Sequence, residues 1–304
     1  MIASGDFNSA QVVVGYDVVV NAIGQSVNLD GVVKLVTDGG VGCSGSLLPD
    51  GFSVLTAGHC VTSSYGSSVP SYITVSFPGS NGFVVDTATT YYVNPGWTGD
   101  GTQGGDLAVL RLDQAAPSSA TRYSLFTGIP TTSPILMAGY GWTGTGLTGG
   151  ISGTFGTLRQ GQNRYDVLGS AIGWSNNLLV GDFDNPTNTA NNALGSTDSA
   201  ILNEVDISHG DSGGPSFYNG QLIGVHDVIS CFVTKADQTD CVNPPSVSTY
   251  NSSYFGQIFG DTSVPAYATW IESEEVPEPV SCSLVLLGLA VAGFLRRRAG
   301  RRPS

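Results

Sequence analysis

Charged residues are scarce in this 304-residue chain, at 12% of the total, and only 11 residues are Lys or Arg against 24 Asp or Glu. Five of the basic residues form one cluster near the end, at positions 296–302, so the rest of the chain has a net charge of −18. Such an acidic body repels nucleic acid and anionic lipid. We therefore expect no nucleic-acid partner.

Histidine and cysteine are also few, with three His and five Cys. Their spacing forms no zinc ligand set, so we expect neither a metal nor a cofactor. The polar, Asn-rich segment 182–198 leaves one alternative open, because its oxygens suit Ca²⁺. Its composition favours a plain loop.

The first ten residues lack a basic start and a long apolar run, so no secretory signal peptide is predicted. This conflicts with the cysteines, four of which lie in the body and are candidates for disulfides, as in proteins of an oxidising compartment. Cys231 and Cys241 bracket a nine-residue loop and are expected to pair, whereas Cys282 lies in an apolar tail. A misassigned start is the interpretation we favour.

Glycine is abundant, with 42 residues, and short apolar runs alternate with Gly, Ser, Thr, Asn and Pro, which predicts an all-β chain. The sequence GDSGGP at residues 210–215 places Ser212 in a turn without bulky neighbours. We interpret Ser212 as a nucleophile, with the N–H groups of Gly210 and Ser212 forming an oxyanion hole. The alternative is a glycine-rich surface turn.

A base for Ser212 is predicted at His59, which follows the apolar run of residues 52–55 and so lies at the end of a strand. Cys43 and Cys60 flank the same hairpin, and an oxidised pair there would fix His59. The carboxylate that orients the imidazole is expected at the head of a buried strand. Asp106 has that setting, and Asp100 is the fallback.

Three segments resemble the signature segments of trypsin-like (chymotrypsin-fold) serine proteases, and they occur in that family's order: TAGHC at 56–60, DLAVL at 106–110 and GDSGGP at 210–215. The resemblance covers roughly residues 32–271. It implies two six-stranded antiparallel barrels, one to about residue 128 and one after it, with a closing C-terminal helix. The protease domain is then residues 31–275, preceded by a segment 1–30 that has the place of a pro-region.

The resemblance also implies roles for residues around the nucleophile. Asp206, six positions before Ser212, has the place of the residue at the base of the S1 pocket, where an aspartate accompanies a preference for Arg or Lys. His209 is expected to shape substrate contacts, and Asp227 and Ile229 replace two small residues of the pocket wall. A surface role for Asp206 is the alternative.

In the same family a freshly cut N-terminus pairs with the aspartate before the nucleophile, here Asp211. The sequence VVGY at residues 13–16 partly matches such a start, but no basic residue precedes it, so a tryptic activation cut is not supported. A side chain that satisfies Asp211 is the alternative.

Near the C-terminus, Ser263 and Pro265 predict the start of a helix with an apolar stripe at Tyr267, Trp270 and Ile271. Beyond it, a Pro-Glu-Pro sequence at 277–279, an apolar span at 280–295 and the Arg cluster resemble the PEP-CTERM sorting signal of Gram-negative bacteria. That resemblance implies export, a transmembrane helix in the inner membrane with the body outside the cytoplasm, and processing by exosortase. A plain tail anchor is the alternative.

Together these features predict an exported serine endopeptidase that acts on proteins or peptides at the cell surface or outside the cell. The rival hypothesis is a non-catalytic surface-matrix or adhesion protein on a protease scaffold.

Overall fold

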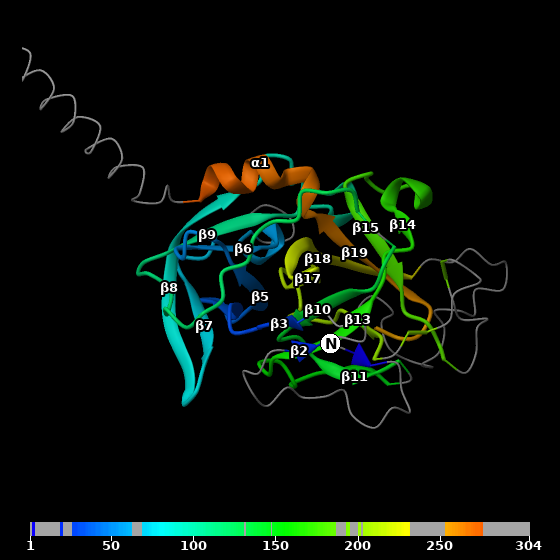
Figure 1. Cartoon of the computed structure of the whole chain (residues 1–304), viewed down its shortest axis with the longest axis horizontal. Coiled ribbons are helices and arrows are strands. Elements are labelled where there is room, and N and C mark those ends of the chain that lie inside the picture. Colours follow the sequence, from blue (N-terminus) through cyan, green and yellow to red (C-terminus); the bar gives the residue numbers. More distant parts are fainter. Residues whose placement is uncertain are drawn as a thin grey trace, which may run out of the picture.

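The computed structural model describes residues 2–3, 19–20, 26–62, 69–130, 132–146, 148–186, 193–194, 200–201, 203–231 and 253–275 (Figure 1). These residues form strands, three short 3₁₀ helices and one α-helix. The 3₁₀ helices are η1 (Gly58–Cys60), η2 (Gly101–Gln103) and η3 (Gly169–Ile172). The all-β prediction is therefore confirmed for this part of the chain.

A closed six-stranded barrel makes up the first half, with strand order β4-β5-β6-β9-β8-β7. Neighbouring strands are antiparallel, and closure leaves no unpaired edge. Side chains such as Leu35, Val75 and Phe77 are fully buried inside it, each stabilising the fold by about 1.5–3 kcal/mol. The strands are β4 (Val32–Thr37), β5 (Gly42–Leu47), β6 (Ser53–Thr56), β7 (Ile73–Gly79), β8 (Gly82–Val93) and β9 (Ala108–Leu112).

An open seven-stranded sheet, with strand order β13-β10-β17-β18-β19-β15-β14, forms most of the second half. Its longest strand, β18, pairs with β17 on one side and β19 on the other. The strands are β10 (Ile135–Gly139), β13 (Arg159–Asn163), β14 (Val167–Leu168), β15 (Leu178–Asp182), β17 (Pro215–Tyr218), β18 (Gln221–Cys231) and β19 (Gln257–Ser263).

The prediction of a second closed barrel is not met in the described residues. Strand β16 (Val205–Asp206), which lies beside β13, meets it through one bridge, Gln162 to Glu204. Instead β16 pairs with β1 (Ile2–Ala3), in a four-stranded sheet that also contains β11 (Thr143–Thr145) and β12 (Gly149–Ile151). A separate pair joins β2 (Val19–Val20) to β3 (Ser26–Val27).

The single described α-helix, α1 (Val264–Glu274), begins where the sequence predicts it. Ser263 occupies the N-cap position, although its side chain makes no capping hydrogen bond, and a proline lies in the first turn. The helix buries Val264 and Ile271 against the core of the first barrel, so α1 covers this barrel on the side of β6 and β9 (Figure 1). At its other end Arg111 Nη2 donates to the carbonyl of Glu274 at 2.7 Å.

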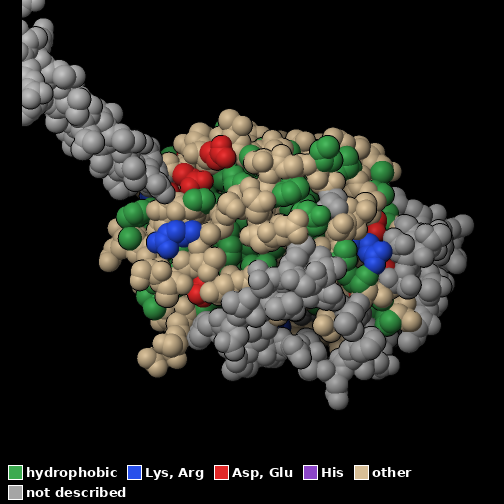
Figure 2. All heavy atoms as spheres, viewed as in Figure 1, with side chains coloured by type: hydrophobic (Ala, Val, Ile, Leu, Met, Phe, Trp, Pro, Cys, Tyr) green, Lys and Arg blue, Asp and Glu red, His purple; other side chains and the backbone are tan. Residues whose placement is uncertain are grey.

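The predicted sorting signal, residues 276–304 with its transmembrane span at 280–295, lies outside the described residues. No helix within the described part of the chain has the length and apolar character needed to cross a membrane. On the face drawn in Figure 2, charged side chains are few, as the composition leads one to expect.

Candidate active site

His59 lies in η1, directly after β6, and its backbone is fixed from two sides. The Cys43–Cys60 disulfide joins η1 to β5, as predicted from the hairpin. Gly58 has no room for a side chain, because a Cβ there would come within 2.9 Å of Asp106 Oδ1. The ring of Trp97, which the sequence did not single out, lies 6.5 Å from the imidazole. The disulfide, the close approach at Gly58 and the ring of Trp97 thus fix the position of His59.

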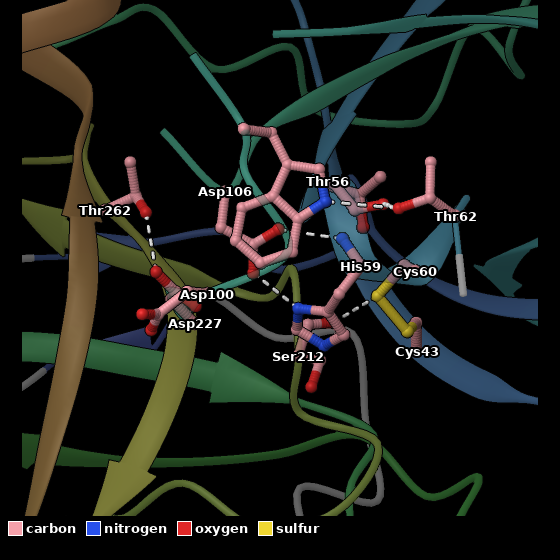
Figure 3. Close-up of polar contacts among 12 residues, drawn as sticks. Cys43, Thr56, His59, Cys60, Thr62, Asp100, Asp106, Ser212, Asp227 and Thr262 are labelled. Atoms are coloured by element: carbon pink, nitrogen blue, oxygen red, sulfur yellow. Dashed lines mark hydrogen bonds and ion pairs between the residues drawn. A yellow bond between two sulfur atoms is a disulfide. The ribbon is translucent and has the colours of Figure 1, made fainter. Parts of the chain in front are cut away.

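Asp106 is fully buried and contacts His59 twice. Its Oδ1 accepts the backbone N–H of His59 at 2.7 Å, and its Oδ2 lies 2.5 Å from His59 Nδ1 (Figure 3). Asp100, the fallback, instead caps η2 by accepting the N–H of Thr102 at 3.0 Å. The structure therefore brings together the histidine and the aspartate that the sequence proposes.

Burial and charge act in opposite directions on the pKa values of this pair. Burial lowers the pKa of His59, but the charge of Asp106 and the hydrogen bond to it outweigh burial and raise that pKa above its ordinary value. Burial likewise raises the pKa of Asp106, but the charge of His59 and the hydrogen bonds that Asp106 accepts lower it overall. The pair thus favours an ionised aspartate next to an imidazole with increased proton affinity.

Ser212 lies in a loop that β5 of the first barrel holds. The backbone N–H of Ser44 donates to the Ser212 carbonyl at 2.8 Å. In Figure 3 the imidazole of His59 lies between Asp106 and Ser212. Among the described residues no hydrogen bond joins Ser212 Oγ to the His59 ring. In serine hydrolases this bond is often long or poorly aligned until substrate binds.

The backbone around Gly210 leaves two N–H groups available. Neither the N–H of Gly210 nor that of Ser212 donates to an acceptor among the described residues. Trp142 N–H donates to the His209 carbonyl at 2.8 Å, which turns the N–H of the same peptide, that of Gly210, the other way. Gly210 has φ +90°, a conformation that favours glycine.

Two further contacts fix this loop. Ser44 Oγ donates to the Gly210 carbonyl at 2.8 Å and accepts the N–H of Tyr140 at 3.0 Å. Ser44 carries no motif that sequence reasoning could have used, because its role depends on a contact with a residue 166 positions away.

Asp211 is buried and accepts backbone hydrogen bonds from Gly141 at 2.8 Å and Ser208 at 2.9 Å. A Cβ at Gly139 or Gly141 would come within 2.2–2.3 Å of its carboxylate oxygens, so both positions need glycine. Backbone amides thus bind this carboxylate, an arrangement the sequence did not anticipate. The candidate N-terminal start at residues 13–16 lies outside the described residues.

The four proposed substrate-binding residues occupy different settings. Asp206 in β16 is fully buried, its Oδ1 accepts the N–H of Ile207 at 2.8 Å, and burial raises its pKa to about 8.

The other three lie outside β16. The His209 side chain is largely exposed, its ring lies 4.7 Å from that of Trp142, and partial loss of solvent around the ring lowers the pKa of His209. Ile229 packs against the apolar cluster of the second half. Asp227 lies near Asp106, and its Oδ2 accepts a hydrogen bond from Thr262 Oγ1 at 3.0 Å.

A buried polar network lies behind the nucleophile loop. His226 Nδ1 is 2.9 Å from Asp261 Oδ1, and the other oxygen of Asp261 accepts bonds from Tyr165 and Ser216. The backbone of His226 accepts the N–H of Gly213 and donates to the carbonyl of Gly214. This network positions the turn that carries Ser212, and sequence reasoning found only His226 of its members.

The acidic groups near the loop 182–198 bind backbone amides. Asp182 Oδ2 accepts the N–H groups of Ala193 and Leu194, and Glu204 accepts those of Asp184 and Ile201. Burial raises the pKa of Glu204 to about 9. Much of the loop itself, the side chain of Cys231 and the whole of Cys241 lie outside the described residues, so the calcium alternative and the second disulfide stay predictions.

A six-stranded barrel with a His–Asp pair facing a serine turn, closed by a C-terminal helix, defines a hydrolase of the chymotrypsin-fold class. Comparison with known families gives the same class: the family described as Trypsin matches residues 22–254. The chain therefore belongs to the trypsin family.

Among solved structures, the chain is similar to neuropsin, described as a serine protease expressed in the limbic system of mouse brain. The TM-score is 0.56 at 18% identity, over 80% of this chain and 93% of that one, which shows a shared fold. A search of curated proteins found no match.

Proposed function

We propose that this protein is an exported serine endopeptidase that cleaves peptide bonds through an acyl-enzyme. The observation that carries the proposal is the double contact between Asp106 and His59, facing a serine whose neighbouring N–H groups are available. Membership of the trypsin family supports a peptidase.

In the proposed reaction His59 takes the proton of Ser212 Oγ as the serine attacks the substrate carbonyl. Asp106 holds the Nδ1–H tautomer and stabilises the imidazolium that forms. The N–H groups of Gly210 and Ser212 donate to the oxyanion. His59 then passes its proton to the leaving amine as the peptide bond breaks. A water molecule next gives a proton to His59 and attacks the acyl carbonyl, and His59 returns that proton to Ser212 Oγ as the ester bond breaks.

We further propose that Asp206 favours substrates with Arg or Lys before the scissile bond. Its Oδ2 is buried and has no hydrogen-bond partner among the described residues, so a cationic side chain would supply a donor and would favour the ionised form of this carboxyl, whose pKa burial raises. Peptides that differ only in this residue test the preference. Equal cleavage of Arg, Lys and Leu peptides would contradict it.

Export and C-terminal processing by exosortase are proposed from the tail sequence at 277–302 and are supported by the Cys43–Cys60 disulfide. Reading both ends of the protein recovered from cells tests this part. A cut next to residues 276–279 is expected, and an intact tail in the mature protein would contradict sorting.

The activity itself is tested with a fluorophosphonate probe on the mature protein. Stoichiometric modification at Ser212 is expected, and Ser212→Ala should keep the fold and lower peptide hydrolysis by about 10⁴-fold or more. Ser208→Ala, a serine in the same loop, is the control. Absence of labelling, or full activity in Ser212→Ala, would favour the non-catalytic scaffold instead.

A further inference from the structure

Asp227 of β18 lies next to the proposed catalytic pair. One nitrogen of His59 and one carboxyl oxygen each of Asp106 and Asp227 lie within 4.8 Å of one another. Figure 3 shows Asp227 and its partner Thr262 next to Asp106. Two carboxyl groups this close in a buried site do not both ionise at neutral pH, so the pair retains one proton.

The hydrogen bonds decide which carboxyl carries that proton. Both oxygens of Asp106 accept N–H groups of His59, at 2.7 and 2.5 Å, and a carboxylate that accepts on both atoms is ionised. Asp227 accepts one hydroxyl bond, from Thr262, and its Oδ1 packs closely against Gly101. The proton therefore resides on Asp227, which can donate it in a hydrogen bond.

We propose that Asp227 is a positioning residue for the reaction: its protonated carboxyl donates a hydrogen bond to Asp106 and keeps that carboxylate directed at His59. This inference rests on the proposed function. The bond restricts rotation of Asp106 and leaves a single negative charge beside the imidazole. The proposed catalytic group of Ser212, His59 and Asp106 thereby gains Asp227 as a fourth, positioning member.

Electrostatics support this assignment. Burial, the charge of Asp106 and the hydrogen bond to Asp106 raise the pKa of Asp227 well above its ordinary value, while the Asp106 pKa is lowered in part by that same bond. The other titratable groups that face Asp227 come from the elements packed around it. They are Asp106 and Asp261, whose charges also favour a neutral Asp227, together with Asp100, His59, Tyr267 and, on its own strand, His226.

The test compares Asp227→Asn, which keeps a donor but cannot ionise, with Asp227→Ala, which has no donor. We expect Asp227→Ala to lower kcat/KM about 10- to 100-fold through a misdirected Asp106, and Asp227→Asn to stay within about 3-fold of the unmodified protein near neutral pH. Asp113→Asn, at an exposed aspartate that follows β9 and contacts Thr87 and Thr89, is the matched control and should change neither value.

The pH profile separates positioning from a merely structural role. As Asp227 loses its proton at alkaline pH, the donor is lost and two carboxylates repel each other, so activity should fall. Asp227→Asn should lack this alkaline loss. If Asp227→Ala does not fold, the comparison of Asp227→Asn with the unmodified protein alone decides the proposal. An identical loss of activity at alkaline pH in these two proteins would overturn it.

Infrared spectroscopy gives a readout that does not depend on activity. The difference spectrum between the unmodified protein and Asp227→Asn should contain the C=O stretch of a protonated carboxyl near neutral pH, and the difference spectrum for Asp113→Asn should lack this band. Taking the difference removes the signal of other buried carboxyls with raised pKa values, such as Asp206 and Glu204. Unchanged kinetics in a folded Asp227→Ala, or equal damage in both Asp227 variants, would contradict the proposal. Activation of the unmodified protein, but not of Asp227→Asn, by a chelator would also contradict the proposal. It would mean that a cation, and not a proton, lies between Asp106 and Asp227.

The two proposals can fail separately. A protein that the fluorophosphonate does not label, but that keeps the carboxyl band, would refute the protease function and leave the shared proton. A labelled protein without the band would refute only the role of Asp227.

Discussion

The two halves of the molecule hold their parts of the candidate site by different means. In the first half, as far as residue 130, Asp106 is the one buried charged side chain among the described residues, and His59 is fixed by packing, a disulfide and that carboxylate. In the second half the buried residues include many charged or titratable groups: Arg159, Asp182, Asp184, Glu204, Asp206, Asp211, His226 and Asp261.

This difference separates two kinds of rigidity. Apolar packing is non-directional and responds little to pH, so it suits a barrel that only has to hold its shape. Directed bonds to buried carboxylates define the path of a loop more closely, but they leave stability dependent on protonation. The half that carries the proposed nucleophile, Ser212, and the proposed oxyanion donors is of the second kind.

Among variants that test this comparison between the halves, the largest effect is expected from Asp211→Ala, which removes the carboxylate at the centre of the loop that carries Ser212. The N–H groups of Gly141 and Ser208 then lose their acceptor, at a cost of about 1–3 kcal/mol each. Because the Gly210 N–H would no longer be held in place, kcat/KM should fall about 10²- to 10³-fold. Steady-state kinetics and denaturant unfolding measure the two effects.

Phe77→Ala in the first barrel is the control for that comparison. It should lower the free energy of unfolding by about 3–5 kcal/mol through a cavity, with little change in kcat per folded molecule. If Phe77→Ala damaged turnover as much as Asp211→Ala, the division between the halves would be wrong.

A smaller effect is expected from removing the Cys43–Cys60 disulfide, which closes a loop with a sequence separation of 17. The double variant to Ala should lower the free energy of unfolding by about 3 kcal/mol. Chemical denaturation of both proteins under oxidising conditions checks this value. Reducing agent should weaken the unmodified protein more than the double variant, in which only the predicted Cys231–Cys241 bond is left to reduce. Equal effects on the two proteins would contradict the assignment.

The smallest effect, taken per pH unit, concerns Asp206, whose pKa rises from an ordinary 3.8 to about 8 on burial. A carboxyl with a raised pKa stabilises the fold fully below its unfolded pKa, and this contribution is lost as pH rises through 8. The slope is up to about 1.4 kcal/mol per pH unit for this group. Asp206→Asn should flatten the fall in stability between pH 5 and 8.

Denaturation curves at several pH values measure that slope. Asp100→Asn, the same substitution at an exposed position, controls for the loss of one charge. If the free energy of unfolding had the same pH dependence in Asp206→Asn and in the unmodified protein, ionisation of Asp206 would have no effect on stability.

Sequence reasoning reached the β class, the helix α1, the first disulfide and the pairing of His59 with Asp106, because each depends on local patterns or on a family motif. It did not anticipate that β16 would pair with β1, since strand pairing depends on segments about 200 positions apart. It assigned Asp227 to substrate contact, whereas Asp227 lies next to Asp106. Ser44, Tyr165 and Asp261 were missed because nothing in their neighbours along the chain marks them.

Ser44 links the two halves at the level of single atoms, with its amide on the Ser212 carbonyl and its hydroxyl on that of Gly210. A chain opened between β9 and β10 would therefore yield two inert fragments, because neither piece retains both the loop and its support. Mixing the fragments should restore reactivity only as fast as they reassociate. The rate at which reactivity recovers after dilution would then measure how fast the two halves dock.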